Sequence, residues 1–314
     1  EVIGSTTLAQ GANAITRSSG SAVINLAAVT RAVGSGATLD FNVASIATTT
    51  NLNGAGGILT TSLVGTTSTV TGAYATVGKA NWAVTAASGS SNPITALATY
   101  GADTYSSNTN TNITQAAATT AAATTNTLRF NAAQATTLTL TGTLSLQSAG
   151  VLVTPNVGAF PTIITGAAIQ NAANTASLES LIIHQHNTAG ALQINSIIQN
   201  NTNAQQITKS GLGKVFLNAL NTQTGALNLN EGELQVGGTA AAPNTATAAT
   251  LGGANVAINM SQGSTLTFLS NNLAVQDLNT IQGGGTITLA TGNTMPVLMD
   301  TDNANFFGEI IVGG

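Results

Sequence analysis

ITKSGLGKVFLNALNTQTGALNLNEGELQVGG, residues Ile207–Gly238, consists of short runs in which apolar and polar residues alternate. Three such runs place apolar residues two positions apart: Val215 with Leu217, Leu227 with Leu229, and Leu234 with Val236. Because side chains in a strand change face at every residue, each run predicts a short strand that buries one edge. Gly, Asn and Thr separate the runs, and Gly and Asn suit turns because they accept positive φ.

Runs this short and turned this often cannot each form an independent hairpin with its own core. They are stable if each coil of chain stacks on the next, which predicts an all-β chain folded as a parallel β-solenoid. Runs recur about every six to ten residues, so three of them predict a coil of roughly twenty residues. About fifteen such coils, stacked at the strand spacing of a sheet, predict a rod on the order of 70 Å long.

Three regions follow from the pattern. Residues 1–64 carry alternating runs that predict amino-terminal solenoid coils, and residues 116–314 predict regular coils that include the 207–238 repeat. Residues 65–115 lose the alternation, and we interpret them as a non-solenoid excursion, a hairpin or long loop folded against the side of the rod. Alanine and threonine pairs fill 116–127, which we interpret as an extended connector because the Thr pairs disfavour a helix.

Composition excludes several classes of protein. Only 5% of the residues are charged, and 6 Lys+Arg against 10 Asp+Glu give a net charge of −4. No basic patch is available to neutralise phosphates, so we expect no nucleic-acid partner. The 0 cysteines exclude disulfides and thiolate metal sites. No apolar run reaches about 18 residues, so no membrane-spanning helix is expected.

The 207–238 stretch also resembles the autotransporter-associated β-strand repeat of bacterial surface proteins. The matching positions are Lys209, Gly211-x-Gly213, Val215-x-Leu217, Asn221, Thr224-Gly225 and Gly232-Glu233-Leu234-Gln235-Val236-Gly237. Gln223 departs from the family, which usually has an aromatic residue before Thr-Gly. The likeness is specific over about 181–238 and weaker over 126–180 and 251–314, where Gly283–Leu289 and Asn305–Gly313 form a looser copy. The resemblance implies a right-handed parallel β-helix that is exported to the cell exterior.

Only a few polar groups in the sequence are candidates for a metal-binding or catalytic site. His184 and His186 project to one face of a strand, and we interpret them as an exposed polar pair and not a metal site, because further ligands are missing. Glu231 and Glu233 flank Gly232 and are interpreted as solvated turn residues, although two carboxylates are the minimum for glycoside hydrolysis. Asp300, Asp302 and Asn303 are interpreted as a polar turn in preference to a calcium site. We therefore expect no catalytic residues, no metal and no cofactor.

The chain's 1 Trp and 3 Tyr all lie in the excursion, as Tyr74, Trp82, Tyr100 and Tyr105. As candidate ligand-binding residues they form a sugar-stacking platform. The alternative, which we favour, is a small satellite core that holds the excursion to the rod.

Three functions stay open at this point. The first is a structural and adhesive segment of an exported bacterial surface protein or extracellular fibre, without enzymatic activity. Both ends of the chain look like solenoid rungs, so we expect them to be covered head to tail by neighbouring copies or by flanking coils of one polypeptide. The second is a module that binds surface glycans through residues 65–115. The third is a polysaccharide-degrading β-helix enzyme, which the scattered charges disfavour. The expected location is extracellular or on the bacterial cell surface.

Overall fold

The protein is described by a computed structural model covering residues 2–17, 22–32, 34–43, 57–62, 72–85, 91–172, 180–239, 248–254, 256–271, 275–278, 280–299 and 305–313. Across these ranges the regular structure is β-strand, apart from one 3-10 turn, η1 (Pro155–Val157). No helix in this part of the chain has the length and apolar character needed to cross a membrane. The expectation of an all-β chain is confirmed.

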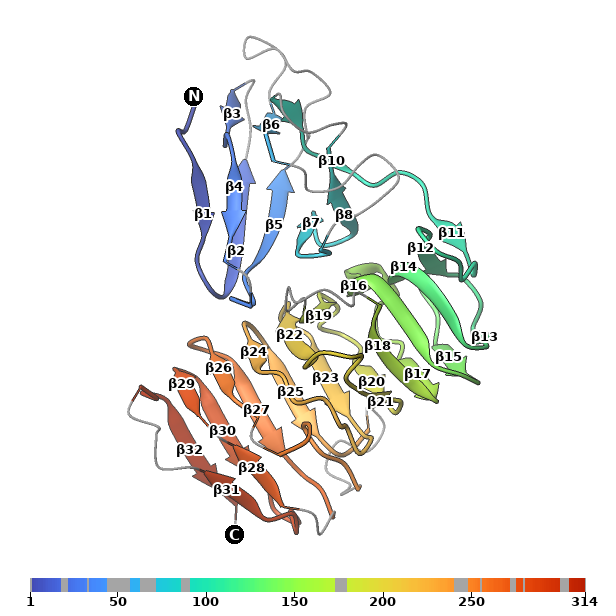
Figure 1. Ribbon diagram of the computed structural model, residues 1–314, viewed down its shortest axis with the longest axis vertical. Helices are drawn as coiled ribbons and strands as arrows, with labels where there is room; N and C mark the ends of the chain where they lie inside the picture. The colour runs from blue at the N-terminus through green and yellow to red at the C-terminus, as the bar shows by residue number, and fades with distance from the viewer. Residues whose placement is uncertain are drawn as a thin grey trace.

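Two long parallel sheets form the larger part of the molecule (Figure 1). The eleven-stranded sheet follows the order β11 (Gly101–Ala102), β12 (Asn110–Ile113), β14 (Ala123–Phe130), β16 (Leu144–Val153), β19 (Ser180–Gln185), β22 (Gln206–Ser210), β24 (Leu227–Leu229), β26 (Ile258–Met260) and β29 (Ile281–Gly283), with β18 (Ala168–Asn171) and β21 (Ile197–Ile198) beside it. The nine-stranded sheet follows β13 (Ala117–Thr120), β15 (Thr136–Leu140), β17 (Thr162–Gly166), β20 (Leu192–Ile194), β23 (Lys214–Leu217), β25 (Glu233–Val236), β27 (Thr265–Phe268), β30 (Thr286–Leu289) and β32 (Glu309–Val312). A short parallel pair joins β28 (Gln276–Leu278) to β31 (Val297–Met299).

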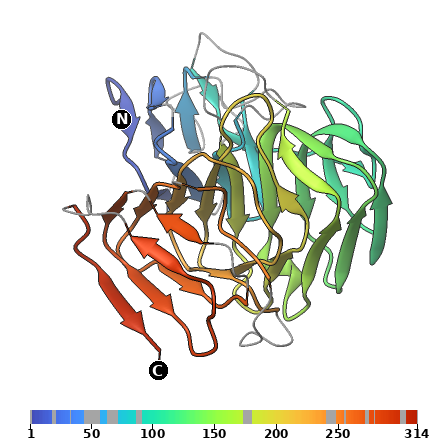
Figure 2. The same ribbon diagram turned by 60° about the horizontal axis from the view of Figure 1, so that its bottom comes forward.

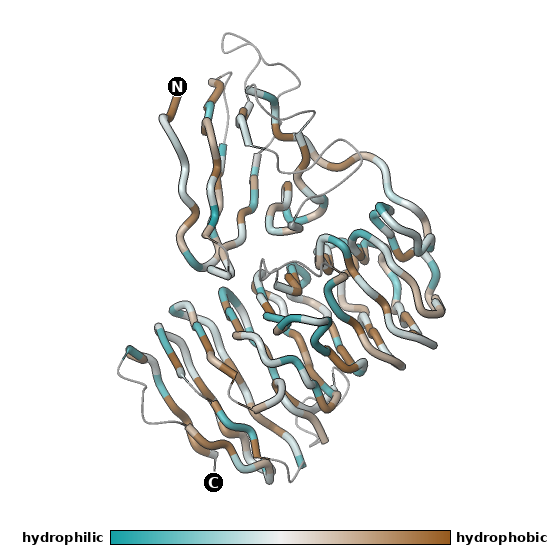
Figure 3. The backbone as a smooth tube through the Cα atoms, viewed as in Figure 1, coloured by the Kyte–Doolittle hydropathy of each residue, from teal (hydrophilic) through white to brown (hydrophobic). Residues whose placement is uncertain are grey.

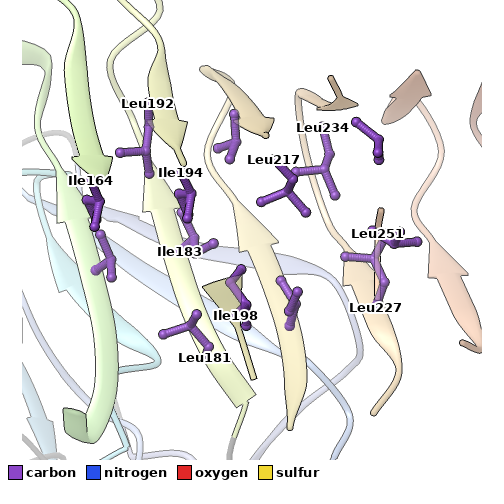
Figure 4. Packing of buried hydrophobic residues seen from close by; sticks show 14 of the residues in the cluster. Ile164, Leu181, Ile183, Leu192, Ile194, Ile198, Leu217, Leu227, Leu234 and Leu251 are labelled. Carbon is purple, nitrogen blue, oxygen red and sulfur yellow. The ribbon is translucent and has the colours of Figure 1, made fainter. Parts of the chain in front are cut away.

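Each pass of the chain adds a strand to each long sheet, and the strands stack in register. Leu227 pairs with Ile207 on one side and Ile258 on the other, while Leu234 pairs with Val215 in the neighbouring sheet. Like residues therefore lie over like residues, and the apolar ones fill the space between the sheets (Figure 4). The alternation in the 207–238 stretch predicted these strands correctly.

The number of residues in each pass varies more than the sequence predicted. Registered partners are 17 residues apart from Asn110 to Thr127 but 32 residues apart from Gly150 to Ile182. Residues 116–127 also differ from the expected connector, because β13 and the start of β14 pair within the two sheets. Small Ala and Thr side chains fit there, since Ala118 is buried in the core and the Thr125 hydroxyl bonds that of Thr111 at 2.7 Å.

Strands β1 to β10 form an amino-terminal unit with its own core. They are β1 (Thr6–Leu8), β2 (Ala12–Arg17), β3 (Val23–Asn25), β4 (Val29–Arg31), β5 (Thr38–Val43), β6 (Gly57–Thr60), β7 (Ala75–Val77), β8 (Asn81–Val84), β9 (Asn92–Pro93) and β10 (Thr95–Ala96). Parallel pairs join β1 to β4, β2 to β5, β5 to β7 and β3 to β6, and Phe41 and Ile58 lie in the core of this unit.

Antiparallel strand pairs account for the fading alternation of the predicted excursion. Within the described ranges, the antiparallel pairs of strands are β7 with β8, β8 with β10, and β6 with β9. The excursion nevertheless ends earlier than residue 115, because β11 and β12 already belong to the eleven-stranded sheet.

The two parts lie side by side and run in opposite directions. Figures 1 and 2 show strands progressing from β1 to β10 along one part and returning from β11 to β32 along the other. Consequently β1 and β32 lie on the same side of the molecule. The single rod of about fifteen coils expected from the strand spacing is therefore wrong: the chain folds back on itself. Apolar residues recur along the strands of both parts (Figure 3).

A polar seam as the candidate functional site

A seam of polar contacts joins the amino-terminal unit to the outer face of the eleven-stranded sheet. The hydroxyls of Thr38 in β5 and Ser210 in β22 lie 2.8 Å apart. The Asn230 side-chain amide donates to the Gly36 carbonyl at 2.7 Å. We call the contact region defined by these residues and His184, which is described below, the seam.

One end of the seam is apolar. Trp82, with 0% of its surface exposed, packs with Ala73, Val84 and Leu97 of the amino-terminal unit against Leu152 of β16. Next to this cluster the chain passes from β10 to β11. This packing fits the satellite core that the sequence favoured.

The other candidate aromatic residues are spread over different clusters. Tyr100 packs at the edge of the Trp82 cluster, where the Arg129 guanidinium lies 4.2 Å from its ring centre, and burial raises the pKa of its hydroxyl. Tyr74 packs on the amino-terminal core, with the Arg31 guanidinium 5.2 Å from its ring centre. Tyr105 packs on the core between the long sheets, and burial raises the pKa of its hydroxyl as well. The structure therefore brings together Trp82 and Tyr100 but not all four residues.

A small cavity of about 80 Å³ opens in the polar part of the seam. Both parts of the molecule line it with polar residues, which include Thr38, Asp40, Thr76, Lys79, His184, His186, Ser210 and Glu231. One oxygen of Asp40 accepts hydrogen bonds from the Thr76 hydroxyl at 2.7 Å and the Lys79 backbone N–H at 2.9 Å. Its other oxygen is buried without a partner.

The histidine pair is buried, which corrects the expectation of an exposed pair. The alternation placed both side chains on the outer face of β19, but the amino-terminal unit covers that face, leaving His184 1% and His186 9% exposed. The Nε2 atom of His184 lies 2.9 Å from the Ala73 carbonyl. A carbonyl only accepts, so Nε2 carries the proton and Nδ1, which is buried without a partner, carries the lone pair.

Burial and neighbouring cations keep both imidazoles neutral. Burial lowers the pKa of His184 to about 4, and Arg31 and Lys209 add to the effect despite the bond to Ala73. Burial also lowers the pKa of His186 well below its usual range, with further contributions from His184, Lys79 and Lys209. In the ranges that the structure covers, no three His, Cys, Asp or Glu side chains are grouped so that they could hold a metal ion.

Lys209 lies inside the stack of strands, among the core residues. Its position in the sequence repeat did not predict this burial. Lys209 registers with Ile183 and Leu229, both core residues, and is itself fully buried. Its ammonium donates to the carbonyls of Gly211 and of Glu231, the latter at 2.7 Å. Burial lowers the pKa of Lys209 to about 7, although Glu231 and Glu233 partly oppose this.

The two glutamates are more than solvated turn residues. A carboxylate oxygen of Glu231 accepts from the Gly211 backbone N–H at 2.9 Å, and Glu231 reaches the seam cavity. Glu233 forms an ion pair with Lys214 at 2.8 Å. Both carboxylates therefore join one pass of the chain to the preceding one. Asp300, Asp302 and Asn303, the expected polar turn, lie outside the described residues.

A second hollow lies on the outer face of the nine-stranded sheet. It is a groove of about 720 Å³ over β17, β20 and β23, lined by the registered residues Ile163, Gln193 and Phe216 together with Pro161 and Ala191. Its surface is mainly apolar.

The seam contacts connect one part of the fold to another, and their polar groups are arranged to fasten the two together. Signals for a covered face were present in the sequence: Val151-Leu152-Val153 and Leu181-Ile182-Ile183 are apolar on both faces of their strands. Strands covered on both faces read as such continuous apolar runs. Comparisons with protein-family models, with curated proteins and with solved structures gave no match.

Proposed function

We propose that this chain is a non-enzymatic structural segment of an exported bacterial surface protein, in which successive passes are coils of a right-handed parallel β-helix. The in-register parallel stacking of β12 to β29 and of β13 to β32 supports the proposal. Parallel stacking places each side chain beside its counterparts above and below, so uncharged Thr, Asn and apolar ladders are favoured and like charges repel. The low charge content fits this requirement.

The observation that carries the proposal is the open edge at β32. In the described part of the chain β32 pairs with β30, and all four of its residues are exposed. The outer edge of an unpaired strand presents N–H and C=O groups to another strand. The edge can therefore pair with a strand of another copy of the chain.

Because the chain folds back on itself, only some arrangements of neighbouring copies are compatible with the structure. A straight head-to-tail array, expected from the sequence, needs the first and last rungs at opposite ends, whereas β1 and β32 lie on the same side (Figures 1 and 2). We therefore place the association at the β32 edge. Glycan binding through residues 65–115 is a weaker proposal, because Trp82 has no exposed ring face to offer a sugar.

The β32 edge is tested by changing Ile310 to Lys. Ile310 pairs with the core residue Ile287, so a lysine here directs a charge inward at the edge and opposes pairing. We expect the native chain to associate as its concentration rises, measured by light scattering after size-exclusion chromatography, and Ile310→Lys to abolish association. The matched control is Thr288→Lys, which places the charge on the outer face of β30 and should associate normally. A native chain that stays monomeric at every concentration contradicts the proposal.

A further inference from the structure

The seam combines three features. It joins two parts with separate cores, it is polar over most of its contacts, and both histidines of the chain lie in it. Neither histidine takes part in the proposed structural role of the stacked strands.

The geometry allows one neutral tautomer of His184. Its Nε2 proton is directed at the Ala73 carbonyl, so a second proton must bind Nδ1. That atom has no hydrogen-bond acceptor, and the rings of Trp82 and His184 form a T-shaped pair with centres 5.5 Å apart. A second proton therefore places a charge on a ring that is 1% exposed and has no acceptor at Nδ1, which is unfavourable.

The neighbouring charges oppose protonation as well. His186 lies next to His184, with ring centres 5.6 Å apart. Three cations, Arg31, Lys79 and Lys209, act on the pair from β4, the β7–β8 turn and β22.

Two carboxylates line the same cavity. One Asp40 oxygen accepts from Thr76 and Lys79 while its other oxygen is buried without a partner, and Glu231 accepts from Gly211. These two carboxylates are outnumbered by the three cations that act on the histidine pair.

We propose that the seam is an acid-sensitive latch, in which protonation of His184 and His186 releases the polar half of the amino-terminal unit from the eleven-stranded sheet. The Trp82 cluster remains packed, because its contacts with Leu152 are apolar and do not titrate. Leu97 and Tyr100 belong both to this cluster and to the connection between β10 and β11, so the connection serves as the hinge. The contacts between Thr38 and Ser210 and between Gly36 and Asn230 are the ones that part.

The sign of the effect follows from the two states of the seam. The closed seam holds neutral imidazoles, while the open seam exposes them to water with an ordinary pKa of 6.5. Closure therefore weakens as the pH falls below 6.5, and the loss from His184 is complete near pH 4. Histidine is the side chain whose ordinary pKa lies in this window.

Two spin labels on opposite sides of the seam report the distance between the amino-terminal unit and the eleven-stranded sheet. Gln10 and Gln262 are both exposed, and they lie on facing turns, since a Cβ placed on Gly11 comes within 3.2 Å of the Ser261 hydroxyl. The chain has 0 cysteines, so Gln10→Cys with Gln262→Cys provides the only attachment points for spin labels. Pulsed electron paramagnetic resonance then measures the label separation across the pH range.

We expect one short distance at neutral pH and a reversible shift to longer distances between pH 6.5 and 4. His184→Gln with His186→Gln removes both imidazoles while keeping an amide donor for Ala73, so the labels should stay close throughout. If the double variant does not fold, as judged by circular dichroism, His186→Gln alone must lower the pH midpoint of opening. The proposal is overturned if the native seam stays closed at pH 4, if the variant opens at the native midpoint, or if acid unfolds the long sheets together with the seam.

Discussion

Replacing Lys209 with Met tests the most unusual side chain of the stack. Lys209 is fully buried among core residues, and burial lowers its pKa from 10.5 to about 7. One pKa unit corresponds to about 1.4 kcal/mol, so a charged Lys209 costs the folded state on the order of 5 kcal/mol at neutral pH and below. The unfolded chain retains its proton up to pH 10.5 while the folded chain loses it near pH 7.

The unfolded state therefore binds more protons than the folded state between these pH values, and the free energy of unfolding rises with pH. Between pH 7 and about pH 9.5, just below the ordinary tyrosine pKa of 10, the expected rise in the free energy of unfolding is about 3 kcal/mol. Urea unfolding followed by circular dichroism at each pH measures it. Lys209→Met should flatten the rise, whereas Lys214→Met, which changes the surface ion pair with Glu233, should retain it. An equal rise in the native chain and in Lys209→Met would show that the buried lysine does not cause the pH dependence.

Two further substitutions test the packing of the amino-terminal unit. Gly36→Ala places a Cβ 2.4 Å from the Asn228 side chain, so we expect it to lose about 1–3 kcal/mol more than Gly78→Ala. Both glycines have positive φ, at 66° and 58°, but a Cβ on Gly78 meets no atom within 4 Å, and equal losses in urea unfolding contradict a close seam. Trp82→Ala removes the centre of the cluster with Leu152 and should cost about 3–5 kcal/mol, seen as a lower melting temperature. A variant that melts like the native chain places Trp82 outside the core.

Local alternation was enough to predict individual strands. Leu227 with Leu229 and Leu234 with Val236 mark β24 and β25, because a strand that faces a core on one side must alternate. The parallel stacking followed from the shortness of the runs and the frequency of turns.

Local alternation could not predict that the amino-terminal unit covers the outer face of the eleven-stranded sheet. His184 projects outward as expected, yet it is buried because residues more than a hundred positions earlier pack on it. The fold-back depends on contacts between remote segments, such as Thr38 with Ser210, and these leave no periodic signal. Lys209 was read as part of a repeat, while its burial depends on carbonyls that only the folded corner brings together.

Successive passes of the chain stack in parallel and in register, and spin-label pairs on β30 and β32 test this arrangement at single strands. The register joins Thr286 to Glu309 and Thr288 to Ile311, with backbones about 5 Å apart. Cysteine pairs at these positions, each labelled, should give the strongest and nearly equal dipolar broadening. Stronger broadening in the crossed pairs, Thr286 with Ile311 and Thr288 with Glu309, indicates antiparallel strands, and the absence of broadening in all pairs excludes the sheet; either result contradicts the account.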